Sequence, residues 1–265
     1  MATHFQVRIA NEERTYAAQA AQAALDLLDK LESNLSRFRV SSEMAQIAQL
    51  EPGQKMCLSE PAFACLTIAK KMELATGGAF SATSSALQTQ PSFPRWNLHS
   101  AGSSIQCESG RLNFDLGAIG KGFALDRMAE LLRSWDCPAF LLVAGGSSIL
   151  AGDAPIDASG WSCGLGDDNA PQRFFLAHAS LSGSGLAVKG SHILDPRTGQ
   201  PALRQNRAWA LTDTAAESDA LSTASMVLSE PELETVLAQD SSWLVFLETD
   251  GPARPMGSRP LPPQA

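Results

Sequence analysis

The stretch Asp115-Leu-Gly-Ala-Ile-Gly-Lys-Gly-Phe-Ala-Leu-Asp126 lies at the centre of this chain and decides its fold. The apolar residues at its start, from 112 to 116, alternate as in a strand. The apolar residues after Gly120 recur at helical spacing. Its glycines, at positions 117, 120 and 122, allow a tight turn and a close approach of backbone N–H groups to a ligand. A helix N-terminus attracts anions, and Lys121 adds a positive charge there. The stretch therefore predicts a phosphate or pyrophosphate site, although a strand–helix turn with a solvated lysine has the same pattern.

Helical and strand patterns alternate irregularly on both sides of this stretch. We expect helices at about 17–38, 43–51, 60–76, 120–137, 217–228 and 230–239. We expect strands at about 1–9, 112–116, 139–144, 209–212 and 243–248, and an irregular connection or weak hairpin over 81–110. The lack of a regular strand–helix–strand rhythm favours an α+β fold, with a single domain at 1–250. Residues 251–265 carry five prolines and are expected to be a flexible tail.

Composition and charge narrow the classes of function. The 265 residues are 44% hydrophobic and 18% charged, as in ordinary globular proteins. The net charge of -8, without a run of basic residues, argues against a nucleic-acid partner. No apolar stretch approaches the roughly 20 residues of a transmembrane segment.

The cysteines and the start of the chain bear on location. The five cysteines are scattered without a C-x-x-C pair, which favours a reducing compartment over a zinc site or a disulfide framework. A strand pattern begins at Met1 with no signal sequence before it. We therefore expect a cytoplasmic protein.

A second motif, His-Ile-Leu-Asp-Pro-Arg-Thr-Gly, covers residues 192–199. Asp195 and Gly199 suit a tight turn, because Asp accepts local N–H bonds and Gly tolerates positive φ. His192 is a candidate general base, since histidine titrates near neutral pH. The alternative is a hairpin that carries an incidental histidine.

A third motif, Asp219-Ala-Leu-Ser-Thr223, lies in an expected helix. Residues four apart share one face of a helix, so the Asp219 carboxylate and the Thr223 hydroxyl can meet one ligand. Both are hard oxygen ligands of the kind that Mg²⁺ accepts. The alternative is structural: Asp219 serves the helix N-terminus and Thr223 bonds back within the helix.

The order and spacing of these motifs resemble the ApbE family of FAD:protein FMN transferases. The matching positions are 115–126, Gly145-Gly146, 192–199 and 219–224, and the likeness extends to about residue 250. The resemblance implies a T-fold-like α+β architecture. It also implies Mg²⁺-dependent transfer of FMN from FAD to a Ser or Thr hydroxyl of an acceptor flavoprotein, with release of AMP.

The resemblance assigns roles to individual residues. His192 and Asp219 would be catalytic, and the metal would be held by the Asp219 and Thr223 side chains and the Ala118 carbonyl. The residues that would contact FAD are Phe38, Gly117, Gly120, Lys121, Asp126, Ser182, Gly183, Asp195 and Thr198.

The chain departs from the family at two positions where the family usually has aspartate. Ser147 follows the glycine pair, and Ser81 follows Gly-Ala-Phe. Most members also carry a lipoprotein signal. These departures leave open a degenerate FAD-binding protein without catalysis. A Mg²⁺-dependent FAD pyrophosphatase that uses water as acceptor also stays open, because it would share the leaving group and the metal site.

Overall fold

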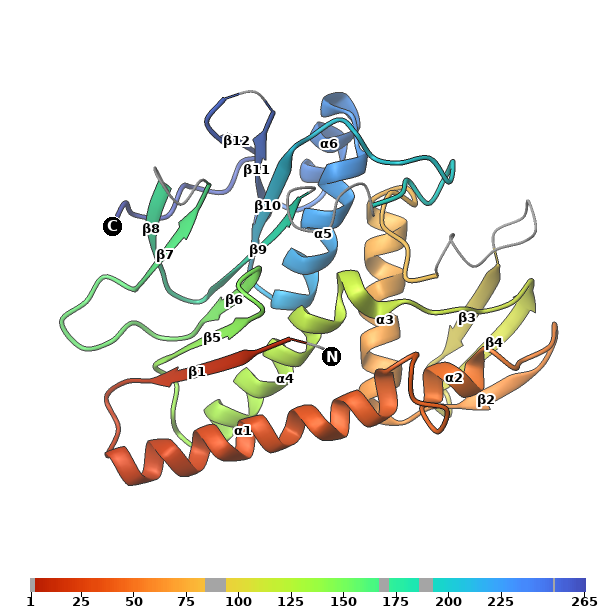
Figure 1. The fold of residues 1–265 in the computed structure, drawn as a ribbon, viewed down its shortest axis with the longest axis horizontal. Coiled ribbons are helices and arrows are strands. Elements are labelled where there is room, and N and C mark those ends of the chain that lie inside the picture. Colours follow the sequence, from red (N-terminus) through yellow and green to blue (C-terminus); the bar gives the residue numbers. More distant parts are fainter. Residues whose placement is uncertain (1–2, 84–93, 167–171, 186–192, 250) are drawn as a thin grey trace.

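The structure is a computed structural model that describes residues 3–83, 94–166, 172–185, 193–249 and 251–265. Its centre is a seven-stranded sheet in which every neighbouring pair is antiparallel (Figure 1). In sheet order the strands are β1 (Phe5–Ile9), β5 (Phe140–Ala144), β6 (Ser148–Ala151), β9 (Ala179–Gly185), β10 (Arg207–Thr212), β11 (Leu244–Glu248) and β12 (Arg254–Met256). An antiparallel sheet combined with packed helices confirms the predicted α+β class.

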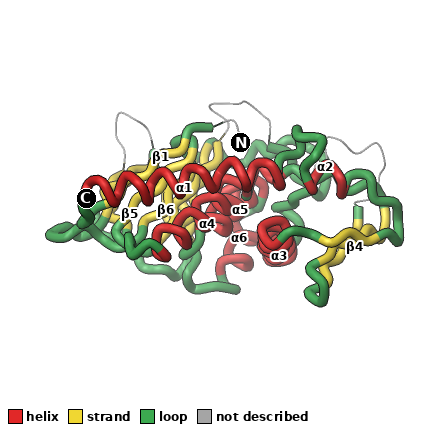
Figure 2. The backbone as a smooth tube through the Cα atoms, turned by 90° about the horizontal axis from the view of Figure 1, so that it is seen from below, coloured by secondary structure: helices red, strands yellow, loops and turns green. Residues whose placement is uncertain are grey.

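Helices cover one face of this sheet (Figure 2). Those that pack most closely on the sheet are α1 (Arg14–Leu35), α4 (Gly120–Ser134) and α5 (Ala215–Val227), and a short 3-10 turn, η2 (Leu116–Ala118), precedes α4. Beside them lie α2 (Glu43–Ile47), which packs on α1, α3 (Glu60–Ala75), which packs on α1 and α5, and α6 (Glu230–Leu237). Phe140 and Leu142 of β5 pack against α1 and α4, whereas Leu141 points to the opposite face. No helix in the described ranges is both long and apolar enough to cross a bilayer.

Two smaller sheets flank the central one at opposite ends of the molecule (Figure 1). The ribbon of β7 (Trp161–Leu165) and β8 (Gln172–Leu176) covers the sheet face that the helices leave open. At the other end, β2 (Lys55–Cys57), β4 (Ser104–Ser109) and β3 (Arg95–His99) form a three-stranded sheet. The hairpin of β3 and β4 confirms part of the weak hairpin expected over 81–110.

The expected strand at 112–116 is wrong. Only Phe114 pairs there, in an isolated bridge with Thr83, and the chain then enters η2. The apolar residues at 112, 114 and 116 are buried against the core without a continuous partner strand. Burial of alternating residues therefore produced a strand pattern in a segment that has only one bridge.

The C-terminal residues differ from the expected flexible tail. Strand β12 pairs with β11, and the carbonyl of Pro263 accepts a 2.8 Å hydrogen bond from the Phe175 N–H. Arg259 pairs with Asp213 at 2.8 Å. Proline lacks an N–H but keeps its carbonyl, and an edge strand needs donors on one side only, so this proline-rich segment can still join the fold.

Candidate active site

The centre of the candidate site is the carboxylate of Asp219, in the second turn of α5. Its side chain is only 3% exposed. Lys121 Nζ lies 2.9 Å from Oδ1 and 3.1 Å from Oδ2. The Gly122 N–H donates to Oδ2 at 3.2 Å, and the Ser148 hydroxyl donates to Oδ1 at 3.2 Å. Two motifs that lie 98 residues apart in the sequence therefore meet in one buried, fully paired carboxylate.

The close approach of α4 and α5 depends on Gly122. A Cβ at this position would overlap the Ala215 carbonyl group and lie 2.7 Å from the Ala216 nitrogen. One helical turn further on, the Asp126 carboxylate accepts the N–H groups of Ala215 (2.7 Å) and Ala216 (2.8 Å). Burial raises the pKa of Asp126 to about 7, and these two N–H donors act in the opposite direction. The structure thus places Asp126, expected to contact FAD, as the cap of α5.

The residues that lead into α4 form a tight turn. Asp115 accepts the N–H of Gly117 at 3.0 Å, which closes η2. Lys121 Nζ lies 3.4 Å from the Gly117 carbonyl oxygen, so the lysine folds back over this turn. Gly120 is the first residue of α4, and η2, which contains Ala118, packs against α5. The structure therefore brings the predicted glycines, Lys121 and Ala118 to the helix that carries Asp219.

Thr223 lies one turn after Asp219 on α5. Its hydroxyl donates to the Asp219 carbonyl oxygen at 3.2 Å and lies 3.2 Å from the Ser184 hydroxyl. The back-bonding alternative for Thr223 is therefore realised in this structure. Asp219 instead pairs with Lys121 and does not cap its own helix.

A seam of hydroxyl groups joins β9 to α5. Ser180 and Ser182 each lie 2.8 Å from the Ser218 hydroxyl, and Ser184 lies 3.0 Å from that of Ser222. Serines two apart on a strand thus face serines four apart on a helix. Both spacings can be seen in the sequence, although nothing there shows that the two segments pair. Ser182 is fully buried in this seam, so the structure gives this expected FAD contact a packing partner.

Gly183, the neighbouring expected contact, lies within the sheet. Its N–H donates to the Ser147 carbonyl oxygen at 2.7 Å, and a Cβ there would lie 2.7 Å from the Trp209 ring. Ser147, where the family usually has aspartate, thus lies beside β9. The adjacent Ser148, which contacts Asp219, was missed because nothing local in the sequence distinguishes it.

The turn at 195–199 is confirmed and is tied to α6. The Asp195 carbonyl oxygen accepts the N–H groups of Thr198 (3.2 Å) and Gly199 (2.8 Å), and Gly199 has a φ of 71°. The Arg197 guanidinium contacts the Asp195 carboxylate at 2.9 Å and that of Glu232 at 2.8 Å. These partners raise the pKa of Arg197.

Glu232 itself closes the capping box of α6. It accepts hydrogen bonds from the Ser229 hydroxyl (2.6 Å) and the Ser229 N–H (2.8 Å). These bonds, together with the one from Arg197, lower the pKa of Glu232 to about 2. Glu232 therefore supports the turn at 195–199. The sequence does not indicate this role, because its partner Arg197 lies 35 residues away.

Phe38 lies in the loop after α1 and is 82% exposed. The Arg37 guanidinium lies 4.7 Å from the centre of the Phe38 ring and 3.1 Å from the Asp115 carboxylate. The predicted aromatic contact is therefore tethered to the segment that opens α4. His192 lies outside the described residues.

The cluster offers oxygen ligands for a cation. The Asp219 carboxylate, the Thr223 hydroxyl and the Ala118 carbonyl are hard donors of the kind that Mg²⁺ accepts. Within the described ranges, no three His, Cys, Asp or Glu side chains come together as a metal site. One carboxylate suits a cation that keeps most of its ligands as water and phosphate oxygens. The donor set thus fits Mg²⁺ that arrives with a nucleotide, provided that Lys121 releases Asp219.

A groove of about 460 Å³ lies beside Arg197. Gly78 and Ser81 also line it, so the departure at Ser81 lies beside the motif at 192–199. The Ser81 hydroxyl lies 2.9 Å from Glu73 Oε1. The position where the family usually has aspartate therefore still has a carboxylate beside it.

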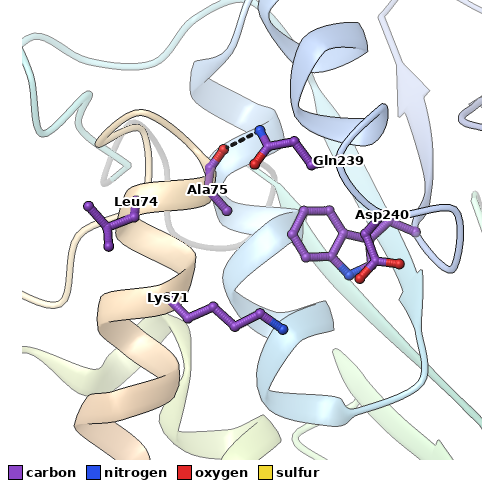
Figure 3. Close-up of a pocket in the computed structure, with 6 residues that line it drawn as sticks. Lys71, Leu74, Ala75, Gln239 and Asp240 are labelled. Atoms are coloured by element: carbon purple, nitrogen blue, oxygen red, sulfur yellow. Dashed lines mark hydrogen bonds between the residues drawn. The ribbon is translucent and has the colours of Figure 1, made fainter.

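A second hollow, of about 370 Å³, lies between α3 and the connection from α6 to β11 (Figure 3). The Gln239 side chain donates to the Ala75 carbonyl oxygen at 3.0 Å across it. Leu74 points away from the other lining side chains in this view. None of the predicted site residues lines this hollow.

Comparisons with known proteins give relatives along nearly the whole chain. The family model described as the ApbE family matches residues 1–246. The FAD:protein FMN transferase of Klebsiella pneumoniae is 24% identical over 153 residues, which cover 52% of this chain and 43% of that protein. The enzyme of the same description from Vibrio cholerae is 22% identical over an alignment of 290 residues, which covers 94% of this chain and 86% of that one. The chain thus spans less than half of the Klebsiella relative.

Solved structures show the same fold. The flavin transferase ApbE from Vibrio cholerae has a TM-score of 0.80 at 19% identity, and the match covers 97% of this chain and 94% of that one. The Pseudomonas stutzeri flavinyl transferase ApbE, in its apo form, has a TM-score of 0.77 at 20% identity, with 95% and 89% covered. At these identities the likeness establishes the architecture.

Proposed function

The chain belongs to the ApbE family, and on that premise we propose that it is an FAD:protein FMN transferase. It transfers FMN from FAD to a Ser or Thr hydroxyl of an acceptor flavoprotein, requires Mg²⁺ and releases AMP. The observation that carries this proposal is the buried Asp219 carboxylate paired with Lys121 at the start of α4. A carboxylate and a lysine beside a helix N-terminus suit a metal-bound pyrophosphate.

The proposed reaction exchanges one phosphorus–oxygen bond for another. The acceptor hydroxyl oxygen bonds to the phosphorus of the FMN half, and the bond from that phosphorus to the bridging oxygen breaks. The electron pair leaves with AMP, and the hydroxyl proton passes to a base. We assign the base to His192, because Ser and Thr are weak nucleophiles at neutral pH without one.

The described residues bind and orient the pyrophosphate in this proposal. Lys121, at the first turn of α4, contributes positive charge beside N–H groups that favour an anion. The Asp219 and Thr223 side chains and the Ala118 carbonyl would hold Mg²⁺. When bound, Mg²⁺ neutralises charge that builds on the phosphate oxygens.

The other predicted residues have two kinds of role in the proposal. Contacts to FAD are assigned to Phe38, Gly117, Gly120, Asp195 and Thr198. Asp126, Ser182 and Gly183 contribute indirectly, by fixing α5 and β9 around Asp219.

Location is part of the same proposal. All five cysteines are free, and four of them are buried. Unpaired cysteines favour a reducing compartment. We assign the acceptor to the cytoplasm on this ground.

The test is FAD turnover followed by mass spectrometry in the Asp219→Asn variant. With an acceptor flavoprotein domain present, the wild-type protein should release AMP from FAD only when Mg²⁺ is added, and Asp219→Asn should not release it. Glu217→Gln is the matched control, since it removes the same charge from the same helix at a residue that pairs with Lys71. Equal turnover in wild type and Asp219→Asn would contradict the assignment.

The same assay separates two other outcomes: a pyrophosphatase, which would use the same leaving group and metal site, and a binding protein without catalysis, which the departures at Ser81 and Ser147 favour. A pyrophosphatase would give free FMN and AMP without any acceptor protein. A binding protein without catalysis would return intact FAD after long incubation with Mg²⁺.

A further inference from the structure

We propose that Lys121 is an exchangeable counter-ion that keeps Mg²⁺ from Asp219 until a pyrophosphate draws the lysine away. The metal and the nucleotide would then bind cooperatively, and the metal alone would bind weakly. The identity of the pyrophosphate as that of FAD rests on the proposed function. The exchange itself rests on the contacts of Lys121 and Asp219.

The ammonium group occupies the position that a cation needs. It contacts both oxygens of Asp219, at 2.9 and 3.1 Å. The Asp219 side chain is 3% exposed and that of Lys121 is 23% exposed. The lysine therefore covers the carboxylate from the side nearer to solvent, from which a hydrated cation would arrive.

The remaining donors cannot replace the charge of the lysine. The Gly122 N–H and the Ser148 hydroxyl each donate to one oxygen of Asp219, at 3.2 Å. Both are neutral, and a buried carboxylate without a counter-charge is costly. Asp219 thus needs a cation at all times, and a divalent ion beside the ammonium group would meet like-charge repulsion. The two cations are therefore alternatives.

The start of α4 offers the lysine a second partner only when an anion is bound there. Ile119, the N-cap residue of α4, makes no side-chain capping hydrogen bond. The N-terminus of α5, in contrast, is already closed by Asp126. A pyrophosphate at α4 would bond to N–H groups of its first turn, of which that of Gly122 now donates to Asp219, and would attract the ammonium group, whose long stem allows the swing. Its departure opens Asp219 to the metal that accompanies the phosphates.

Binding of Mn²⁺, followed by electron paramagnetic resonance without any nucleotide, tests the exchange. The Lys121→Met variant should bind Mn²⁺ at least about tenfold more tightly than wild type, because the competing charge is gone. Lys71→Met is the matched control, since Lys71 also pairs with an α5 carboxylate, that of Glu217, and should leave the affinity unchanged. The double variant Lys121→Met/Asp219→Asn should lose the gain. An unchanged affinity in folded Lys121→Met, or a gain that survives in the double variant, would overturn the proposal.

A second experiment uses the wild-type protein, so its result does not depend on whether the Lys121→Met variant folds. ADP serves as the pyrophosphate probe, and Asp219→Asn with ADP corrects for metal held by ADP alone. Mn²⁺ should bind wild type at least about tenfold more tightly with ADP than without it, and by reciprocity Mn²⁺ should tighten ADP equally. Equal affinity with and without ADP would overturn the exchange. AMP release from FAD is measured separately, so loss of the proposed function and loss of the exchange give different results.

Discussion

Replacing Gly122 with alanine tests the contact on which the candidate site is built. The added Cβ would overlap the Ala215 carbonyl and lie 2.7 Å from the Ala216 nitrogen, whereas ordinary contacts begin at 3.4 Å. Relief of the Ala216 contact alone needs a shift of about 0.7 Å, and the two helices must separate by more than that because the Ala215 carbonyl group lies closer still and both obstructing groups are backbone. This movement would strain the bond from Gly122 to Asp219 and the Asp126 cap of α5.

The loss of stability in Gly122→Ala comes from overpacking at a contact where only backbone atoms could move aside. Overpacking costs about 1–3 kcal/mol, and we expect about 3 kcal/mol here because backbone must move. For a chain of this size that lowers Tm by about 6–12 °C. Turnover of FAD should fall with it, because Asp219 would no longer be held beside the first turn of α4, where the metal and the pyrophosphate are proposed to bind.

The control is Gly120→Ala, in the same turn of the same helix. A Cβ at Gly120 would find its nearest neighbour, Leu116 Cβ, at 3.6 Å, which is an ordinary contact. Thermal melts of both variants, followed by circular dichroism, give the comparison. A Gly122→Ala protein with the Tm of Gly120→Ala would refute the reasoning from the helix contact.

Three further predictions concern charge, acid stability and the hydroxyl seam. Asp219→Asn should lower metal-dependent turnover of FAD at least about 100-fold, measured as AMP release. Because the pKa of Glu232 is lowered to about 2 from 4.5, its stabilisation is complete above pH 4.5 and is lost as the pH falls toward 2. The Tm of Glu232→Gln should therefore lie below that of wild type at pH 6, and the gap should shrink below pH 4.5. Ser218→Ala leaves the buried Ser180 and Ser182 hydroxyls without this partner, so its free energy of unfolding in urea should fall by about 1–3 kcal/mol.

Several elements could be predicted from the sequence because capping and turn residues close together in the chain determine them. The helix expected at 60–76 is α3, and its start carries local signals: Ser59 is the N-cap and a proline stands in the first turn. The turn at 195–199 was predicted from Asp and Gly for the same kind of reason. In both cases the residues that decide the structure are neighbours in the chain.

Contacts between segments that are far apart in the sequence could not be predicted in this way. Gly122 was interpreted as a turn glycine, but its missing side chain makes room for the Ala215 backbone on another helix. Asp126 was assigned to FAD, and its oxygens instead bond N–H groups about 90 residues further along the chain. Nothing near either residue in the sequence records its partner, so only the fold could reveal these roles.

Transfer of FMN is measured most directly with FAD, Mg²⁺ and a flavin-free acceptor domain that in its mature form carries FMN on a threonine. Mass spectrometry follows AMP release and the mass of the acceptor together. We expect AMP and acceptor-bound FMN to appear in equal amounts with wild type, and neither to appear with Asp219→Asn. Intact FAD, or AMP with free FMN and an unmodified acceptor, would contradict it.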